Sequence, residues 1–359
     1  MVKCLPFLLS LKVLIPKSVM ANSRLNQAKD NKKDEFYTQL SDIENELSHY
    51  KDQFKGMTVL CNCDDPRVSN FFRYFALKFK TLGLKRLITT CYKNQDVDLF
   101  TQNDCEEAVY LIYDGTPDID HIPSIDELDI RPLKGDGDFR SPECIELLKQ
   151  ADIVVTNPPF SLFREYVAQL MEYDKKFLIM GNNNALHYSE IFPLFKENKM
   201  WLGYSANKTM EFGLPDHYEK WNRIVDGKKY GKVPSITWFT NLDTEMRHQI
   251  MTLYKRYDEK EYPMYYNYPA INVNKVSEIP VDWMGEMGVP DTFLIEYNPE
   301  QFELIGIGSG KSGQSIGVGG ILKEHKALMR GHSAAGDLYY LLPDGTPKVP
   351  YSRIIIKRR

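Results

Sequence analysis

The sequence predicts an α/β fold with a doubly wound, largely parallel sheet and a C-terminal elaboration. With 359 residues, 43% of them hydrophobic, the chain can bury a sizeable core. Short apolar runs alternate with amphipathic stretches between residues 42 and 242, which is the pattern of βα units around a parallel sheet. Past residue 245 this alternation ends. We therefore expect one domain over residues 34–245 and a distinct C-terminal region, 246–359.

The expected strands are short runs rich in the aliphatic and aromatic residues that buried strands favour. The run 108–115 lies in a long polar insertion, residues 93–131, and predicts an edge hairpin, while 235–242 would close the sheet in the antiparallel direction. Helices are expected where apolar residues recur with helical spacing, and Gly83 ends one of them. The strands are predicted at 57–63, 84–92, 108–115, 151–157, 175–182, 199–205 and 235–242, and the helices at 42–54, 65–83, 141–150, 161–173 and 187–198.

The C-terminal region has a different texture. Residues 262–290 are rich in Tyr, Asn and Pro without a clear period, which predicts extended loops that pack on a neighbour rather than an autonomous core. The glycine-rich stretch 306–320 contains Gly310-Lys311-Ser312, but Ile305 stands where a phosphate-binding loop has its first glycine. A flexible loop is the expectation for this stretch.

The first 33 residues are expected to form a flexible leader. Lys3 followed by an apolar run resembles a secretory signal, but Lys12 interrupts that run and Met20 opens a second, polar start. We interpret residues 1–19 as an upstream mis-start or a disordered appendage, with a membrane or signal segment as the alternative. No other apolar run approaches the roughly 20 residues that span a bilayer, so no membrane partner is expected.

Composition excludes a wholesale basic surface. The formal charge is −4 at pH 7, so contact with nucleic acid must come from local clusters such as residues 32–33 and 357–359. No two of the six cysteines have the C-x-x-C spacing of a zinc or redox site. We therefore expect reduced thiols, a cytoplasmic location and no bound metal.

The expected strand 151–157 ends on Asn157-Pro158-Pro159-Phe160. The prolines remove backbone N–H donors and stiffen the chain, which leaves the carbonyl of Pro158 as an acceptor of fixed direction. The side-chain oxygen of Asn157 is a second acceptor, and the ring of Phe160 can stack on a flat heterocycle. This corner is therefore predicted to hold an exocyclic amino group and to turn its lone pair out of the ring plane. The alternative, a plain turn with Phe160 in the core, requires neither the second proline nor the following aromatic residue.

These residues and their surroundings resemble the EcoRI-type adenine-specific DNA methyltransferases. The resemblance spans roughly residues 28 to 305 and the tail 351–359. It implies a Rossmann-like methyltransferase fold that uses S-adenosylmethionine. It also implies an enzyme that acts as a monomer on double-stranded DNA and has a cognate restriction endonuclease as functional partner. The stretches that carry it are 33–47, 61–76, 135–141, 152–166, 173–179, 197–203, 270–275, 287–294 and 298–305.

The resemblance also assigns cofactor residues by position. The segment Asp34, Phe36, Tyr37 and Thr38 corresponds to the one that closes over the methionine end of the cofactor. Asp64 and Asp65 stand where the family's relatives usually carry Gly-x-Gly, so a carboxylate would hold the methionine ammonium; the alternative is that they only cap the following helix. Asp136 or Asp138 would accept the hydrogens of the cofactor's adenine N6, with Phe139 against its face, or these acids are solvated loop residues. Cys91-Tyr92 replaces the acid that usually holds the ribose.

By the same resemblance, the target adenine leaves the duplex and enters the pocket. Asn157 and Pro158 hold its N6, Phe160 stacks on its ring, and N6 attacks the methyl group in line without a covalent enzyme intermediate. The family's site is GAATTC, and the segments 205–234 and 267–275 are expected to read bases. Two alternatives remain open: a catalytically silent DNA-binding protein of the same fold, and a methyltransferase acting on RNA, on cytosine N4 or on protein glutamine.

Overall fold

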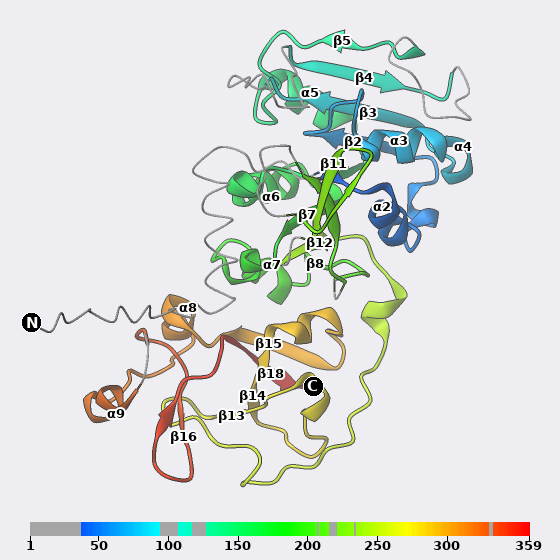
Figure 1. Ribbon diagram of the computed structural model, residues 1–359. Helices are drawn as coiled ribbons and strands as arrows, with labels where there is room; N and C mark the ends of the chain where they lie inside the picture. The colour runs from blue at the N-terminus through cyan, green and yellow to red at the C-terminus, as the bar shows by residue number, and fades with distance from the viewer. Residues whose placement is uncertain are drawn as a thin grey trace, which may run out of the picture. The chain divides into compact units, whose positions relative to one another are not determined.

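The computed structural model describes residues 37–93, 107–116, 127–206, 208–214, 221–232, 235–329 and 333–359 (Figure 1). Residues 36–359 belong to one compact unit. The expected leader, residues 1–33, and the predicted site residues Asp34 and Phe36 lie outside the described residues, as do 207, 215–220 and 233–234 of the expected recognition segment. Within the described part of the chain, no helix combines the length and the apolar character needed to cross a bilayer.

The centre of the fold is an eight-stranded mixed sheet in the order β5-β4-β3-β2-β6-β7-β12-β8. Its four middle strands, β3, β2, β6 and β7, run parallel. The outer strands pair antiparallel, including β12, as expected for residues 235–242. The bounds are β2 Thr58–Asn62, β3 Arg86–Cys91, β4 Val109–Tyr113, β5 Arg131–Pro132, β6 Ile153–Thr156, β7 Lys176–Asn182, β8 Trp201–Leu202 and β12 Ile236–Thr240.

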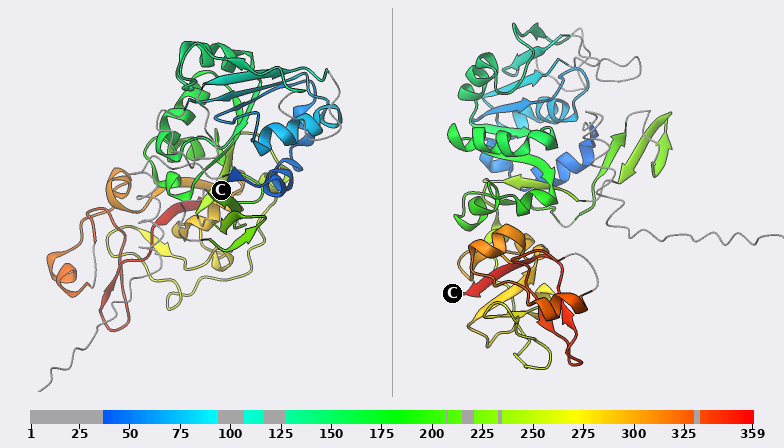
Figure 2. Two further views of the ribbon diagram at one scale, coloured as in Figure 1. Left: turned by 45° about the horizontal axis from the view of Figure 1, so that its top comes forward. Right: turned by 90° about the vertical axis from the view of Figure 1, so that its left-hand side faces the viewer.

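Helices cover both faces of this sheet, because successive strand residues point to opposite sides. In β2, Val59 and Cys61 join a core cluster with side chains of α2, α3 and α4, whereas Leu60 joins a second cluster with α5, α6 and α7. The sheet therefore lies between two helical layers (Figure 2). The bounds are α2 Leu40–Leu47, α3 Asn70–Leu77, α4 Phe79–Leu82, α5 Pro142–Gln150, α6 Phe163–Glu172 and α7 Phe192–Lys196.

Three of the expected helices are shorter than predicted. The helix expected at 65–83 starts late, because the carbonyl of Asp65 accepts the amide hydrogens of Val68 and Ser69 in a turn. The Ser69 hydroxyl then caps α3 by accepting two backbone N–H groups. Two other helices are also shorter than predicted. The helix expected at 42–54 is α2 followed by the 3-10 turn η1 (Lys51–Phe54), and the helix expected at 187–198 is α7, preceded by η4 (Asn183–His187).

A smaller antiparallel sheet has the order β1-β9-β11-β10. It joins β1 (Tyr37–Thr38), part of the segment expected to close over the cofactor, to three strands from the expected recognition segment 205–234. Tyr37 pairs with Gly213 and Thr38 with Phe212. In its described residues, the segment expected to be a loop therefore contains three strands of a sheet. Its strands are β9 Glu211–Leu214, β10 Arg223–Val225 and β11 Lys228–Lys232.

The C-terminal region contains a third sheet, in the order β13-β14-β18-β15. The expectation of extended loops over 262–290 misses the strands β13 and β14, which lie there. The expected packing on a neighbour is found, since Ile271 and Val289 are fully buried in the same core cluster as side chains of α6 and α7. The tail 351–359 supplies β18, which pairs with both β14 and β15. Further elements are β13 Ala270–Asn272, β14 Glu286–Pro290, β15 Phe302–Ile307, β18 Arg353–Arg358, β16 Tyr340–Leu341, β17 Pro347–Lys348, η5 Glu245–His248, η6 Val276–Glu278, η7 Asp291–Ile295, α8 Gly310–Ser315 and α9 Lys323–Leu328.

The expectation of a flexible loop at 306–320 is wrong, since this stretch contains the end of β15 and the helix α8. The strand–turn–helix context of a phosphate loop is thus present, but a carboxylate of the protein accepts the hydrogen bond that a bound phosphate would accept. Asp337 accepts the backbone N–H of Gly310 at 2.9 Å and that of Ala334 at 2.6 Å. The backbone donor at the start of α8 is satisfied within the protein.

Candidate active site

The predicted site segments meet at the carboxyl ends of the four parallel strands. Asp136 follows β3 in space, Asp64 follows β2, and Asn157 follows β6. The chain runs from β2 to β3 on one side and later returns to β6 on the other side of β2. The strand order therefore reverses between β2 and β6, and such a switch point is where open α/β sheets bind their ligands.

Asn157 and the two prolines leave β6 directly at its end, at Thr156. Pro158 is buried, whereas Asn157, Pro159 and Phe160 are half-buried. Phe160 begins the 3-10 helix η3 (Phe160–Leu162), whose first turn closes through a hydrogen bond from Leu162 N–H to the Pro159 carbonyl at 3.0 Å. The ring of Phe160 packs at the margin of a core cluster and keeps part of its surface exposed. The motif is thus a stiff corner held on both sides by regular structure.

A buried threonine joins this corner to the predicted cofactor loop. Thr156, the last residue of β6, is 0% exposed. Its hydroxyl lies 2.5 Å from Asp64 Oδ2 and also contacts the Asn62 carbonyl. Ser69 donates to the other Asp64 oxygen at 2.9 Å. The Asp64 carboxylate is therefore fixed to both the N-terminus of α3 and the residue that precedes Asn157.

Asp64 and Asp65 have different surroundings. The Asp65 carboxylate forms a two-point ion pair with the guanidinium of Arg67, with distances of 2.8 Å to Oδ1 and 2.9 Å to Oδ2. The Asp64 carboxylate accepts hydrogen bonds from the hydroxyls of Ser69 and Thr156, and its N–H bonds to the carbonyl of Thr90 at 2.9 Å. A carboxylate already neutralised by an arginine is a poorer partner for an ammonium group. Of the two predicted residues, Asp64 is thus the better candidate for a cationic ligand.

The loop with Asp136 and Asp138 lies on the end of β3. The Asp136 carbonyl accepts the N–H of Lys93 at 2.7 Å. Gly137 has a φ of +79°, and a Cβ atom there would lie 2.5 Å from the Cys91 carbonyl oxygen. Only glycine allows this close approach. The loop therefore covers the position where an acid on β3 was expected and Cys91 is found instead.

The carboxylate of Asp138 is held by Arg140. The guanidinium donates to both of its oxygens, at 2.9 and 2.7 Å, and this hydrogen bonding lowers the pKa of Asp138 below its ordinary value of 3.8. Arg140 also bonds to Glu165 on α6 at 2.6 Å. The Asp136 carboxylate accepts the backbone N–H of Asp138 at 3.0 Å and forms no ion pair with the described residues. Asp136 is therefore the stronger of the two candidates for an amino-group ligand.

Phe139 is 5% exposed and packs edge-to-face on Tyr166, with ring centroids 5.0 Å apart. The phenol of Tyr166 in turn donates to the side chain of Asn62 at the end of β2. Phe139 thus supports the loop from the core, and its predicted stacking on a cofactor ring stays a prediction. Tyr92, which follows β3, is 42% exposed.

Thr38 brings the predicted closing segment to the same edge of the sheet. Its hydroxyl contacts the Met180 sulfur in β7 at 3.2 Å, and its carbonyl accepts a hydrogen bond from Asn70 at 2.8 Å. Asn70 is the first residue of α3, directly after the Ser69 cap. The backbone of β1 is therefore placed beside the helix start that holds Asp64.

Sequence reasoning missed the residues that connect these segments. Thr156 and Arg140 each sit within two positions of a predicted residue, and a hydroxyl at a strand end or an Arg two residues after an Asp is a usable local signal. The contact of Tyr166 with Asn62 has no such signal, since it joins residues 104 positions apart. Within the described ranges, no three metal-ligating side chains gather.

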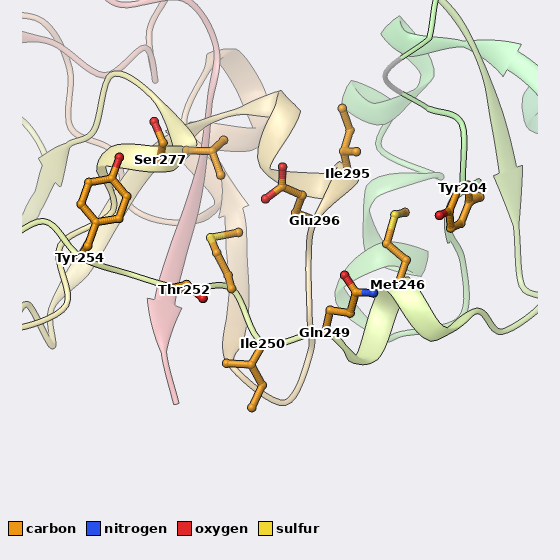
Figure 3. A pocket seen from close by; sticks show the side chains of 11 residues that line it. Tyr204, Met246, Gln249, Ile250, Thr252, Tyr254, Ser277, Ile295 and Glu296 are labelled. Atoms are coloured by element: carbon orange, nitrogen blue, oxygen red, sulfur yellow. The ribbon is translucent and has the colours of Figure 1, made fainter.

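A separate hollow of about 500 Å³ lies where the segment around η5 runs into the C-terminal region (Figure 3). None of the predicted site residues lines it, and no Lys or Arg is among its lining side chains. Its lining combines apolar groups with one carboxylate, so it does not fit a phosphate backbone. The residues that define it include Tyr204, Met246, Ile250, Tyr254, Ile295 and Glu296.

In comparisons with known proteins, one family matches the part of the chain that contains the whole described site. The family described as adenine-specific methyltransferase EcoRI matches residues 24–359. The chain is 47% identical to the type II methyltransferase M.EcoRI of Escherichia coli over 316 residues, covering 86% of this chain and 96% of that protein. It is 43% identical to M.MgeORF184P of Mycoplasma genitalium and 44% identical to M.MpnI of Mycoplasma pneumoniae, in each case over 78% of this chain and 84% of the relative. No solved structure matches.

Proposed function

The chain belongs to the EcoRI family of adenine-specific methyltransferases, and we propose that it methylates the N6 of adenine in double-stranded DNA with S-adenosylmethionine. The target proposed is GAATTC, with a cognate restriction endonuclease as functional partner. We further propose a monomeric, cytoplasmic enzyme with a doubly wound, Rossmann-like catalytic domain over residues 34–245 and a C-terminal region, 246–359, that takes part in recognition. The type II methyltransferase relatives support this proposal.

The observation that carries the proposal is the hydrogen bond between the hydroxyl of Thr156, the residue before Asn157, and the carboxylate of Asp64. The reaction requires a methyl donor and an adenine amino group to be held side by side, and positioning of that kind can lower a barrier by up to about 7–11 kcal/mol. The Asp64 carboxylate and the Asn157 amide lie at adjacent strand ends, and the residue before Asn157 bonds to that carboxylate, so the two groups are suited to this task.

The cofactor fits the groups that are present. The Asp64 carboxylate is held by the hydroxyls of Ser69 and Thr156, and a carboxylate with hydroxyl donors is suited to pair with an ammonium group. Asp136 would accept from the cofactor's adenine amine, and Thr38 lies at the edge where the closing segment is expected. When bound, S-adenosylmethionine supplies a methyl group on a positively charged sulfur.

The chain's own residues would do the rest by holding the target base. The side-chain oxygen of Asn157 and the carbonyl of Pro158 would accept the two hydrogens of adenine N6, while Phe160 stacks on the ring. Extrusion of the base from the duplex costs a few kcal/mol, which contacts in this corner must offset. The proton that N6 loses would pass to solvent, so no general base is assigned.

The experiment is methyl transfer from tritiated S-adenosylmethionine to duplexes with and without GAATTC. Label on the adenine of GAATTC alone supports the proposal. Label on RNA or on cytosine supports a related methyltransferase, and DNA binding without any label supports a silent DNA-binding protein.

A variant assigns the chemistry to the corner. Asn157→Ala should abolish transfer while the affinities for cofactor and DNA change little, because one acceptor for the amine is lost. Asn45→Ala, at an exposed position of α2, is the matched control and should retain full turnover. Unchanged turnover in Asn157→Ala would show that the amine is held elsewhere.

A further inference from the structure

The β10–β11 hairpin exposes large apolar side chains. Trp221, Ile224 and Val225 are 45, 53 and 40% exposed, and every residue from 221 to 228 is exposed. Asp226 and Gly227 form its turn with φ values of +48° and +79°, as a tight two-residue hairpin turn of the I′ type requires. Clustered apolar side chains on a soluble surface mark a contact site.

The hairpin is held firmly at its base. β11 pairs with β9, and Phe212 and Leu214 of β9 are buried in the catalytic core cluster. Arg223 forms an ion pair with Glu211 at 2.5 Å, which ties β10 across the sheet. The strands β9, β11 and β10 are neighbours in one sheet (Figure 2). Its free end therefore projects from a base that is anchored in the core.

The charge of the hairpin is opposite to that of the chain. Residues 221–232 contain four basic residues and one acidic residue, in a protein with a net charge of −4. The register places Val225 opposite Lys228 and Arg223 opposite Tyr230, so these basic and apolar groups share one face, while Ile224 lies on the other face, opposite Lys229. A basic ribbon with an apolar tip is complementary to a nucleic-acid groove, because phosphates line the groove and bases form its floor.

The major groove of duplex DNA is the occupant that this shape and chemistry favour. It is about 12 Å wide and admits a two-stranded β-ribbon. The apolar group that base pairs present there is the C5 methyl of thymine, which aliphatic side chains contact. The hollow of Figure 3, with no basic side chain in its lining, offers no such complementarity.

Resting on the proposed DNA methyltransferase function, we propose that the β10–β11 hairpin enters the major groove of the target. Val225 packs on a thymine methyl group of the recognition site, and Lys228, on the same face, contacts a backbone phosphate. The valine then contributes specificity by contact with thymine, and the lysine contributes affinity without regard to sequence.

The test pairs a protein variant with an altered duplex. Dissociation constants are measured by fluorescence anisotropy for wild type and Val225→Ala, on a GAATTC duplex and on the same duplex with deoxyuridine for thymine in the site. Loss of one buried methyl contact should weaken wild-type binding about fourfold. Val225→Ala should bind the thymine duplex more weakly than wild type and respond little to deoxyuridine. Ile112→Ala, at an exposed position of β4, is the matched control and should behave as wild type.

Several outcomes overturn the inference. The proposed contact is refuted if Val225→Ala binds as wild type does or loses as much affinity on deoxyuridine as wild type. It is also refuted if wild type is insensitive to the thymine methyls. Methyl transfer to the same duplexes is measured separately, so an active enzyme with any of these results refutes the hairpin contact alone. In a second measurement, Lys228→Gln should reduce the slope of log affinity against log salt by about one; an unchanged slope overturns the phosphate contact.

Discussion

Replacement of Thr156 by valine tests the link between the two halves of the site. Valine has nearly the same shape as threonine, so the change removes the hydroxyl without opening a cavity. The hydrogen bond lost is one to a buried carboxylate, with 2.5 Å between Thr156 Oγ1 and Asp64 Oδ2. Hydrogen bonds to charged groups contribute about 1.5–3 kcal/mol net, so the free energy of unfolding should fall by about 2 kcal/mol.

The neighbouring strand β3 offers a matched control. Thr89 is also 0% exposed, but its hydroxyl has no hydrogen-bond partner among the described residues. Thr89→Val therefore removes a desolvated polar group and should leave stability unchanged or raise it by about 1 kcal/mol. The opposite signs distinguish the loss of a specific bond from a general effect of placing valine in the sheet.

Two assays decide the matter. Urea unfolding gives the two free energies, and calorimetric titration with S-adenosylhomocysteine gives the affinity of the cofactor site. Because Thr156→Val frees one oxygen of the proposed ammonium ligand, the affinity should fall about tenfold, equivalent to about 1.4 kcal/mol, and Thr89→Val should not alter it. Equal destabilisation by both variants, or unchanged cofactor affinity in Thr156→Val, would refute the reasoning.

Three further predictions concern other parts of the chain. A protein that starts at Met20 should have full methyl-transfer activity, since the family match begins at residue 24; loss of activity would assign a role to the first 19 residues. Arg140→Gln should raise the pKa of Asp138 toward 3.8, as an NMR titration of that carboxyl would report. Because the pKa is lowered in the folded protein, its stabilisation is present above pH about 4 and is lost as the pH falls through the lowered value; an unchanged pKa would contradict the assignment. Glu46 is fully buried and accepts hydrogen bonds from Tyr50 and from the backbone of Tyr204 and Ser205, so Glu46→Gln should destabilise the protein by about 2 kcal/mol and speed hydrogen exchange at Ser205, with the exposed Glu44→Gln unaffected.

The local sequence pattern predicted the parallel strands at the centre of the sheet and the helices beside them. The apolar runs that became β2, β3, β6 and β7 are flanked by amphipathic helices, and burial on both faces leaves few other arrangements for such runs. The start of α3 was missed because it depends on the Ser69 cap and the turn at Asp65. The third sheet was missed for a different reason. β18 lies between β14 and β15, which are far away in sequence, and no local period reveals such a partner.

The same distinction applies to the site. The corner at Asn157 is legible because two prolines and an aromatic residue constrain what a strand end can do. The choice of Asp64 over Asp65 required structure, since both are acidic and adjacent, and only the contact with Arg67 separates them. Composition gives no indication of which neighbour an acid will pair with.

The pairing of β1 with β9 leads to the last prediction, that cofactor and DNA affect one another's affinity. Thr38 belongs to the segment expected to close over the cofactor, and its backbone pairs with Phe212 at the base of the hairpin proposed to enter the groove. Ordering either end of a four-stranded sheet restrains the other, so each ligand should reduce the entropy that the second must lose. S-adenosylhomocysteine should then tighten DNA binding by at least about fivefold, the lower end of usual coupling, and DNA should tighten S-adenosylhomocysteine binding by the same factor. Anisotropy and calorimetry measure the two factors independently. Coupling that is absent in an active enzyme would mean that the small sheet moves as two separate parts despite its continuous backbone pairing.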